Sequence, residues 1–183
     1  TATDPHIKVA GNGIRKLQEA GREVIVDVLE KECRESNRRF FTFHEKKRPY
    51  IILKWAESAD GLLSPTERNE QKPVWITNVY SRQLVHKWRS EEMAILAGTQ
   101  TVLDDNPSLD VRSWSGTNPI RIILDRQGKI SNTQAFKDRK INTIVLTEQT
   151  NFPILDNLLY EQTSFKNHNP KYITDVLYKH NML

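Results

Sequence analysis

The chain has 183 residues and a formal net charge of +4, with 27 lysines and arginines against 23 aspartates and glutamates. This length supports one hydrophobic core, or two domains at most. The basic residues are scattered and not interleaved with aromatic residues along one face, so we expect no nucleic-acid partner. A phosphorylated small molecule stays open as a partner. No apolar run approaches the ~18 residues of a membrane-spanning helix, which excludes a membrane partner.

The residue types also exclude several kinds of site. The five histidines are isolated from one another, and no His-x-Glu or Cys-x-x-Cys pair could hold zinc, so the sequence predicts no metal site. The single Cys33 cannot form an internal disulfide, which fits a reducing, cytoplasmic location. The glycine-rich residues 10–13 follow no predicted strand, so a dinucleotide-binding fingerprint is not favoured there.

Hydrophobic periodicity predicts an alternation of strands and helices along the chain. Runs of β-branched residues indicate strands, whereas apolar residues three or four positions apart, as at Leu84, Val85 and Trp88, indicate a helix. The predicted elements are a helix from residue 13 or 14 to Gly21, a strand over 23–29, a helix over 30–39, a strand over 50–56, a helix over 81–89, strands over 92–97, 119–125 and 142–147, and a helix over 171–181. This order indicates an α/β fold with a largely parallel sheet flanked by helices.

A domain boundary is placed near residue 44. Residues 44–49 combine a run of charges with Pro49, a pattern typical of a linker, and this divides the chain into residues 1–43 and 44–183. The chain has no initiator methionine, and it stops at Leu183, where the alternation calls for another buried strand. We therefore expect it to be the middle part of a longer protein.

Residues 93–107 (MAILAGTQTVLDDNP) are the most informative segment. The apolar run ends at Gly98, two threonines follow at Thr99 and Thr101, and residues 104–107 combine paired acids with a proline stop. The acids either cap the end of a helix or bind hydroxyl groups of a cofactor or a sugar. The pattern predicts a strand that leads into a tight turn and the polar edge of a pocket.

Four other side chains are candidates for chemistry, each with a plain structural alternative. Lys54 stands inside a predicted apolar strand, where it either faces a cavity or extends from an edge strand to water. Trp75 is either a core residue or a flat wall against a heterocycle. Arg112 and Arg89 suit the bidentate capture of a phosphate, unless they are ordinary surface arginines.

Taken in order, these segments carry a family resemblance. They are RPY at 48–50, LKWAESADG at 53–61, WIT at 75–77, Arg89, AILAG at 94–98, TVLDDNP at 101–107, Arg112 and the strand at 119–125. In this order and spacing they resemble the reductase domain of the bifunctional riboflavin-biosynthesis deaminase/reductases. Segments between residues 4 and 41, including VAGNG at 9–13, resemble the tail of the deaminase domain in the same family.

The resemblance implies a dihydrofolate-reductase-like α/β domain, preceded by the tail of a cytidine-deaminase-like α/β domain. It implies NADPH-dependent reduction of the ribosyl group of 5-amino-6-(5-phosphoribosylamino)uracil to the ribitylamino product. Zinc, and the deamination of the preceding pyrimidine, would belong to the deaminase half outside this chain. A homo-oligomer is left open.

The resemblance also assigns roles to particular residues. Ala56, Trp75, Thr101 and Asp105 fall where the family contacts NADPH, and Arg89, Leu109 and Arg112 fall where it contacts the phosphorylated pyrimidine. Lys54 near the reacting sugar, as a catalytic residue, is our own hypothesis from its charge in an apolar strand. We expect hydride delivery to C1′ of an opened, imine-like sugar.

Some positions depart from the family pattern. Pro73 replaces a frequent serine that touches substrate, Arg126 a small polar residue near the cofactor, and Gln100 a frequent glycine; the loop 62–72 is longer than usual. The family's Glu-Gly-Gly turn is expected beyond Leu183, so we expect this chain alone to lack full activity. The alternatives are a related NADPH reductase with another pterin or pyrimidine substrate, and a non-catalytic fragment of the same fold.

Overall fold

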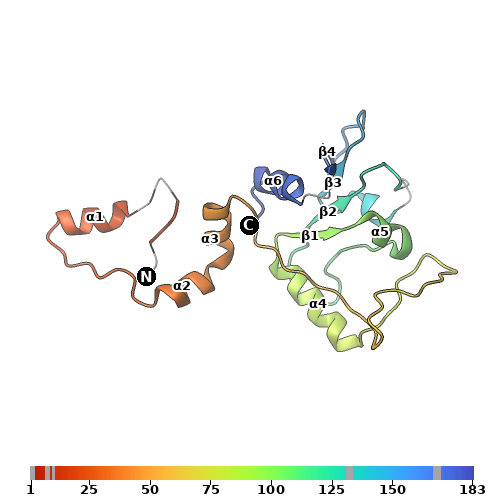
Figure 1. Ribbon diagram of the computed structural model, residues 1–183, viewed down its shortest axis with the longest axis horizontal. Helices are drawn as coiled ribbons and strands as arrows, with labels where there is room; N and C mark the ends of the chain where they lie inside the picture. Colours follow the sequence, from red (N-terminus) through yellow and green to blue (C-terminus); the bar gives the residue numbers. More distant parts are fainter. Residues whose placement is uncertain (1–2, 7–8, 10, 131–133, 167–169) are drawn as a thin grey trace. The chain divides into compact units, whose positions relative to one another are not determined.

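The computed structural model describes residues 3–6, 9, 11–130, 134–166 and 170–183. The chain divides into two compact units, residues 1–52 with 174–183 and residues 53–173. Figure 1 shows the elements of both units in chain order. Residue 44 lies inside a helix, and the predicted domain division there stays a prediction. Across the described part of the chain, no helix combines the length and the apolar character needed to cross a membrane.

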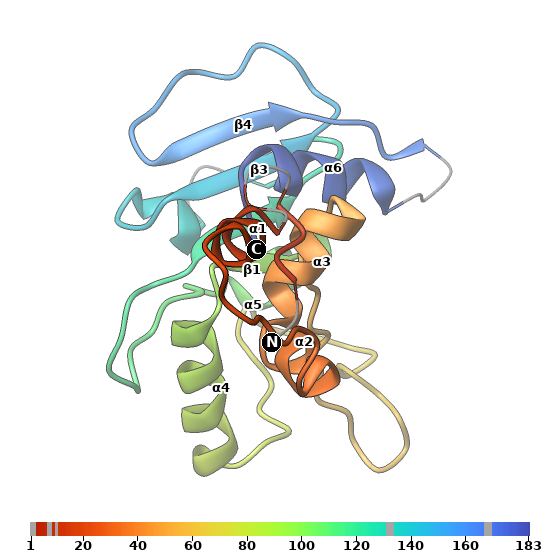
Figure 2. The same ribbon diagram turned by 90° about the vertical axis from the view of Figure 1, so that its left-hand side faces the viewer.

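A four-stranded parallel sheet forms the centre of the unit 53–173. Its strands, in spatial order, are β1 (Ala94–Ala97), β2 (Ile120–Leu124), β3 (Thr143–Thr147) and β4 (Leu158–Gln162). Every neighbouring pair is parallel, and Figures 1 and 2 both show β4 beside β3 at one edge. Because neighbouring strands are parallel, each connection carries the chain back to the end of the sheet at which the previous strand began, and the strands follow one another across the sheet in chain order. The predicted α/β class with a parallel sheet is confirmed.

The two central strands are buried on both faces. In β2 the adjacent residues Ile122 and Ile123 point to opposite faces, and neither is accessible to solvent. Every residue of β3 is buried, and its sequence TIVLT is rich in β-branched side chains. A near-continuous apolar run is the pattern that a strand covered on both faces requires. This explains why residues 119–125 and 142–147 were recognisable as strands.

The main hydrophobic core lies on one face of this sheet. Register places Ala97 beside Ile123 and Ile123 beside Val145, so these side chains form a row across three strands. Val102 of α5 (Thr99–Asp105) and Leu109 belong to the same buried cluster. The Thr99 hydroxyl also donates to the carbonyl oxygen of Leu124 at 2.6 Å. Helix α5 is therefore fixed on the sheet directly after β1.

Helix α4 (Val79–Glu91) precedes β1 and confirms the helix predicted over 81–89. The side chain of Asn78 accepts a hydrogen bond from the backbone N–H of Ser81 at 2.9 Å, which caps the helix. Only His86 of this helix is buried, while the helix ends beside the start of β1 in sequence. The buried position on this helix is therefore occupied by a polar side chain, that of His86.

The other unit is helical. It contains α1 (Asn12–Glu19), α2 (Glu30–Ser36), α3 (Arg38–Lys46) and most of α6 (Lys171–Lys179). Figure 2 shows α2 and α3 following one another. Asn37 is the residue between them in the sequence. The ring of Phe43 lies 4.6 Å from that of Tyr178 on α6. The helices predicted near the start of the chain and over 171–181 are confirmed, whereas the single helix predicted over 30–39 is broken at Asn37 into α2 and α3. The aromatic residues 40–43 and the start of the predicted linker are part of α3.

Two predicted strands are wrong. Residues 23–29 and 50–56 have no regular secondary structure, and Leu53 is 78% exposed. A strand needs a neighbour to pair its backbone groups, and neither segment joins the sheet formed by the described residues. Conversely, α5, β4 and the 3-10 helix η1 (Ala135–Asp138) were not predicted. Segment 99–105 was expected to be a turn, and its hydrogen bonds make it a short helix.

Candidate functional site

Side chains of α4 and the segment after α5 form the first part of the site. The Arg89 guanidinium donates to the backbone carbonyl of Asp110, and the Arg112 guanidinium donates to the Asp110 carboxylate. The imidazole Nδ1 of His86 accepts the backbone N–H of Arg112. Leu109 directly precedes this segment and is buried in the core. The structure thus brings together Arg89, Leu109 and Arg112, the three residues predicted to contact the phosphorylated substrate. We call these residues, with His86 and Asp110, the arginine cluster.

The arginine cluster carries an excess of positive charge. Burial, and then the charge of Arg112, lower the pKa of the Arg89 guanidinium below its usual range. Its Nε is buried and has no hydrogen-bond partner among the described residues. The Asp110 carboxylate accepts from Arg112, and its charge partly opposes the lowering of the Arg89 pKa. A buried guanidinium N–H without an acceptor beside a second arginine is a favourable place for an anion, because phosphate oxygens accept such donors strongly.

Leu109 connects this cluster to the hydrophobic core. Its backbone has a φ of 52°, in the left-handed region that residues other than glycine rarely adopt. The side chain is nevertheless buried against the cluster that contains Val102. Core packing therefore maintains a strained backbone conformation immediately before Asp110. The direction of the following segment depends on that conformation.

Sequence reasoning missed His86. It lies one helical turn before Arg89 on α4, and it is the only buried residue of that helix. Burial, followed by the charges of Arg89 and Arg112, lowers the pKa of its imidazole. The neutral form is the one that can accept an N–H at Nδ1. The spacing of three residues to Arg89 was the signal that could have found it.

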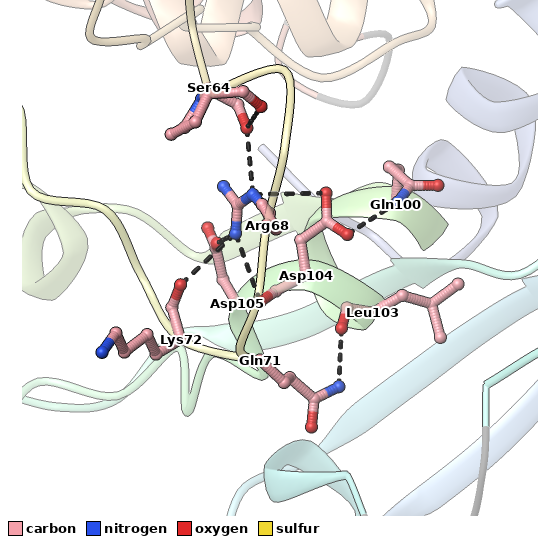
Figure 3. A network of polar contacts seen from close by, with 9 residues as sticks. Ser64, Arg68, Gln71, Lys72, Gln100, Leu103, Asp104 and Asp105 are labelled. Carbon is pink, nitrogen blue, oxygen red and sulfur yellow. Dashed lines mark hydrogen bonds and ion pairs between the residues drawn. The ribbon is translucent and has the colours of Figure 1, made fainter.

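A second polar cluster surrounds the end of α5. The guanidinium of Arg68 lies 2.7 Å from Oδ1 of Asp105, and Figure 3 shows it between Ser64 and the last turn of the helix. Thr101 lies on the same helix and is exposed. The polar side chains of this segment therefore lie on a helix and not on a tight turn, and their place at the edge of a pocket stays a prediction. Helix α5 ends at Asp105, as the helix-stop alternative for residues 104–107 predicted, and hydroxyl binding by the acids stays a prediction.

Trp75 is not a core residue, because 56% of it is exposed. The guanidinium of Arg82 on α4 lies 4.6 Å from the centre of its indole ring, a distance typical of a cation–π contact. The ring is therefore held by the helix and still presents apolar surface. Its use as a wall against a heterocycle stays a prediction.

Lys54 and Ala56 lie in the segment that was wrongly predicted as a strand. Lys54 is exposed, and no hydrogen bond or ion pair joins it to the described residues of the arginine cluster. The argument from a charge inside a buried strand is therefore wrong, and the catalytic role of Lys54 is a prediction without that support. Ala56 is half-buried and precedes a turn. In this turn Gly61 has a φ of 78° and donates its N–H to the backbone carbonyl oxygen of Ser58.

The departures from the family pattern have defined surroundings. Gln100 donates to Oδ1 of Asp104 at 2.7 Å, within helix α5. Arg126 donates to the carboxylate of Glu148 at 2.8 Å. Pro73 is half-buried at the end of the long loop. Among the residues with described positions, no group of three or more His, Cys, Asp or Glu side chains could hold a metal ion.

Comparison with known proteins identifies similar chains. Residues 49–157 match the RibD C-terminal domain. The chain is 40% identical over 150 residues to the riboflavin biosynthesis protein RibD of Aquifex aeolicus, covering 81% of this chain and 41% of that protein. It is 32% identical to the RibD protein of a Synechocystis species, covering 98% of this chain and 50% of that protein. The chain thus spans about half the length of the curated relatives it matches.

Solved structures give the same match. A diaminohydroxyphosphoribosylaminopyrimidine deaminase/5-amino-6-(5-phosphoribosylamino)uracil reductase from Thermotoga maritima is 35% identical, with a TM-score of 0.79 over 96% of this chain and 48% of that chain. RibD from Acinetobacter baumannii is 28% identical, with a TM-score of 0.77 over 98% of this chain and 50% of that chain. The fold described above is therefore that of about half of each of these solved chains.

Proposed function

Because the chain belongs to the RibD C-terminal domain family, we propose that it forms the reductase part of a riboflavin-biosynthesis enzyme. The proposed reaction is the NADPH-dependent reduction of the ribosyl group of 5-amino-6-(5-phosphoribosylamino)uracil, the substrate in the name of the Thermotoga maritima protein. Residues 1–43 would be the end of a deaminase domain and residues 44–183 part of the reductase domain. Zinc would belong to the deaminase domain.

The arginine cluster is the observation that carries this proposal. Two guanidinium groups converge on one short segment, and the buried Nε of Arg89 has no acceptor among the described residues. The phosphate of the proposed substrate supplies both the negative charge and the acceptor oxygens that this arrangement lacks. Arg89 and Arg112 would therefore fix the phosphate end of the substrate, with Leu109 holding the backbone between α5 and Arg112 in place.

The residues of α5 and the Trp75 region fit a nicotinamide dinucleotide. NADPH, when bound, supplies the hydride. The exposed hydroxyl of Thr101 and the carboxylate of Asp105 are suited to ribose hydroxyls, and the exposed indole of Trp75 to a flat ring. Ala56 would contribute a small side chain that allows close approach. We keep Lys54 as a proposed catalytic residue near C1′ of the opened, imine-like sugar, which accepts the hydride.

The arginines would act mainly through positioning. Binding the phosphate at a fixed point limits the motion of the sugar, and holding reactants in an aligned geometry removes much of the entropic part of a barrier. The positive charge of the cluster also attracts a phosphorylated substrate from solution. Both effects depend on Arg89 and Arg112 together, because Asp110 partly offsets the charge of either one.

The proposal is tested with the full-length gene product. NADPH oxidation is followed by absorbance in the presence of the ribosylamino substrate, and the product is identified by mass spectrometry. We expect oxidation that depends on this substrate and forms the ribitylamino compound. A folded protein that oxidises no NADPH would contradict the proposal. Turnover of dihydropterins alone would favour the related reductase, and substrate binding without turnover the non-catalytic fragment.

A further inference from the structure

We propose that Arg68 is a positioning residue for the cofactor, acting through Asp105 at the end of α5. The inference rests on the proposed function, because Asp105 is a proposed NADPH contact. Arg68 belongs to the loop 62–72, which the sequence comparison with the family pattern predicts to be longer than usual.

The guanidinium of Arg68 is held from several sides (Figure 3). Its Nη1 lies 2.7 Å from Oδ1 of Asp105 and 3.3 Å from the backbone carbonyl oxygens of both Asp104 and Lys72. Its Nε donates to the hydroxyl of Ser64 at 3.0 Å. A planar group with this many partners has little freedom to rotate, so the carboxylate of Asp105 that it binds is also oriented.

The ion pair between Arg68 and Asp105 is more buried than an ordinary surface pair. The side chain of Arg68 is 19% exposed and that of Asp105 is 28% exposed. In the same loop, the ion pair between Lys72 and Glu70 is 66% and 64% exposed. Water and salt screen the exposed pair strongly, so it contributes little. The Arg68 pair is screened less and can hold two segments together.

The loop also completes the end of the helix. The last carbonyl groups of a helix lack partners within it, and they carry partial negative charge. Arg68 donates to the carbonyl oxygen of Asp104, and the side-chain amide of Gln71 donates to that of Leu103 at 2.6 Å. The loop thereby supplies both a positive charge and two hydrogen bonds to the end of α5.

The position of Arg68 affects how the negatively charged phosphates of a dinucleotide approach the end of α5. Asp104 and Asp105 are adjacent carboxylates at the negative end of a helix, where their charges repel each other and would repel the phosphates of a dinucleotide. Arg68 offsets this charge by pairing with both carboxylates, at 2.7 Å from Oδ1 of Asp105 and 4.0 Å from Oδ2 of Asp104, and of the two oxygens of Asp105 it binds Oδ1. Oδ2 stays available as an oriented acceptor for a ribose hydroxyl. Arg68 would therefore favour NADPH binding without touching the reacting atoms.

The test compares Arg68→Ala, Arg68→Lys and the control Lys72→Ala in the full-length gene product. We expect Arg68→Ala to raise KM for NADPH about 3- to 30-fold, with kcat and KM for the pyrimidine unchanged. Arg68→Lys should lie between it and the wild type, because an ammonium group keeps the charge but not the planar fork. Lys72→Ala removes only the exposed pair and should leave KM for NADPH unchanged. Thermal melting checks that each variant is folded.

A double-mutant cycle separates positioning from simple loop stability. Arg68→Ala in an Asp105→Asn background should change KM for NADPH less than about twofold, because the carboxylate on which Arg68 acts is already gone. An equal effect in both backgrounds overturns the inference. So does a lower KM in Arg68→Ala, which would mean that Arg68 competes with the cofactor. If the wild type neither binds nor oxidises NADPH, the proposed function fails, and this inference with it. An active wild type with unchanged Arg68→Ala overturns this inference alone.

Discussion

Nδ1 of His86 lies 3.4 Å from the backbone nitrogen of Arg112 and accepts its hydrogen bond. One turn further along α4, Arg89 donates to the carbonyl oxygen of Asp110. Two side chains on one face of a helix therefore hold the same short segment of backbone. A side chain whose backbone is attached to a helix starts from a more defined position than one on a free loop. The placement of the Arg112 guanidinium depends on this attachment.

Replacing His86 should weaken substrate binding without changing the chemistry. His86→Ala removes the acceptor for the Arg112 N–H, a neutral hydrogen bond that contributes about 0.5–1.5 kcal/mol, so we expect KM for the pyrimidine to rise about 2- to 12-fold. His86→Asn keeps an oxygen near the place of Nδ1 and should have a smaller effect. Steady-state kinetics measure both. A fall in kcat with KM unchanged would contradict a positioning role.

The same histidine makes stability depend on pH. Burial, then the charges of Arg89 and Arg112, hold its pKa below the ordinary value of 6.5, while Asp110 opposes this effect. The unfolded chain then binds a proton more readily than the folded one, so His86 contributes stability that is complete above pH 6.5 and is lost as the pH falls through the folded pKa. Urea unfolding between about pH 7.5 and about pH 5 should show a steeper loss for the wild type than for His86→Asn. Parallel curves would show that His86 is not the group responsible.

Local sequence was sufficient for elements whose pattern is complete in itself. The runs at β2 and β3 are apolar on both faces, and α4 has a helical apolar spacing with Asn78 as its cap. The segments 23–29 and 50–56 also contain runs of β-branched and other apolar residues, but they lack a paired strand. Composition reports the preference of a residue for a strand, whereas pairing depends on distant residues.

The same distinction applies to the residues of the candidate site: some were identifiable from the sequence, and others depend on distant partners. Arg89 and Arg112 were identifiable by residue type, because guanidinium groups suit phosphate wherever they occur. The contributions of His86 and Arg68 come from partners that are 26 and 37 residues away in sequence, respectively. No local spacing encodes either contact. Lys54 shows the opposite case. It was chosen because its charge lay in a predicted apolar strand, and the structure has no strand there.

Removing the Arg112 guanidinium should cost substrate affinity specifically. A hydrogen bond to a charged group contributes about 1.5–3 kcal/mol, so Arg112→Ala should raise KM for the pyrimidine about 10- to 150-fold and leave KM for NADPH unchanged. Arg15→Ala is a suitable control, because Arg15 and its partner Glu19 are 69% and 67% exposed on α1. It should change neither constant. An unchanged KM in Arg112→Ala would exclude the proposed phosphate contact.

Leu109 should reverse the usual order of alanine and glycine substitutions. Both Leu109→Ala and Leu109→Gly remove a buried side chain, at a cost of about 2–5 kcal/mol of unfolding free energy. Alanine keeps the unfavourable left-handed backbone at φ 52°, whereas glycine adopts it freely, so Leu109→Gly should be more stable than Leu109→Ala by about 1 kcal/mol. Val102 lies in the same core but within helix α5, where Val102→Gly should be less stable than Val102→Ala by about 1 kcal/mol. Denaturant unfolding of the four variants measures these differences. The same order at both positions would show that the left-handed conformation of Leu109 contributes no strain.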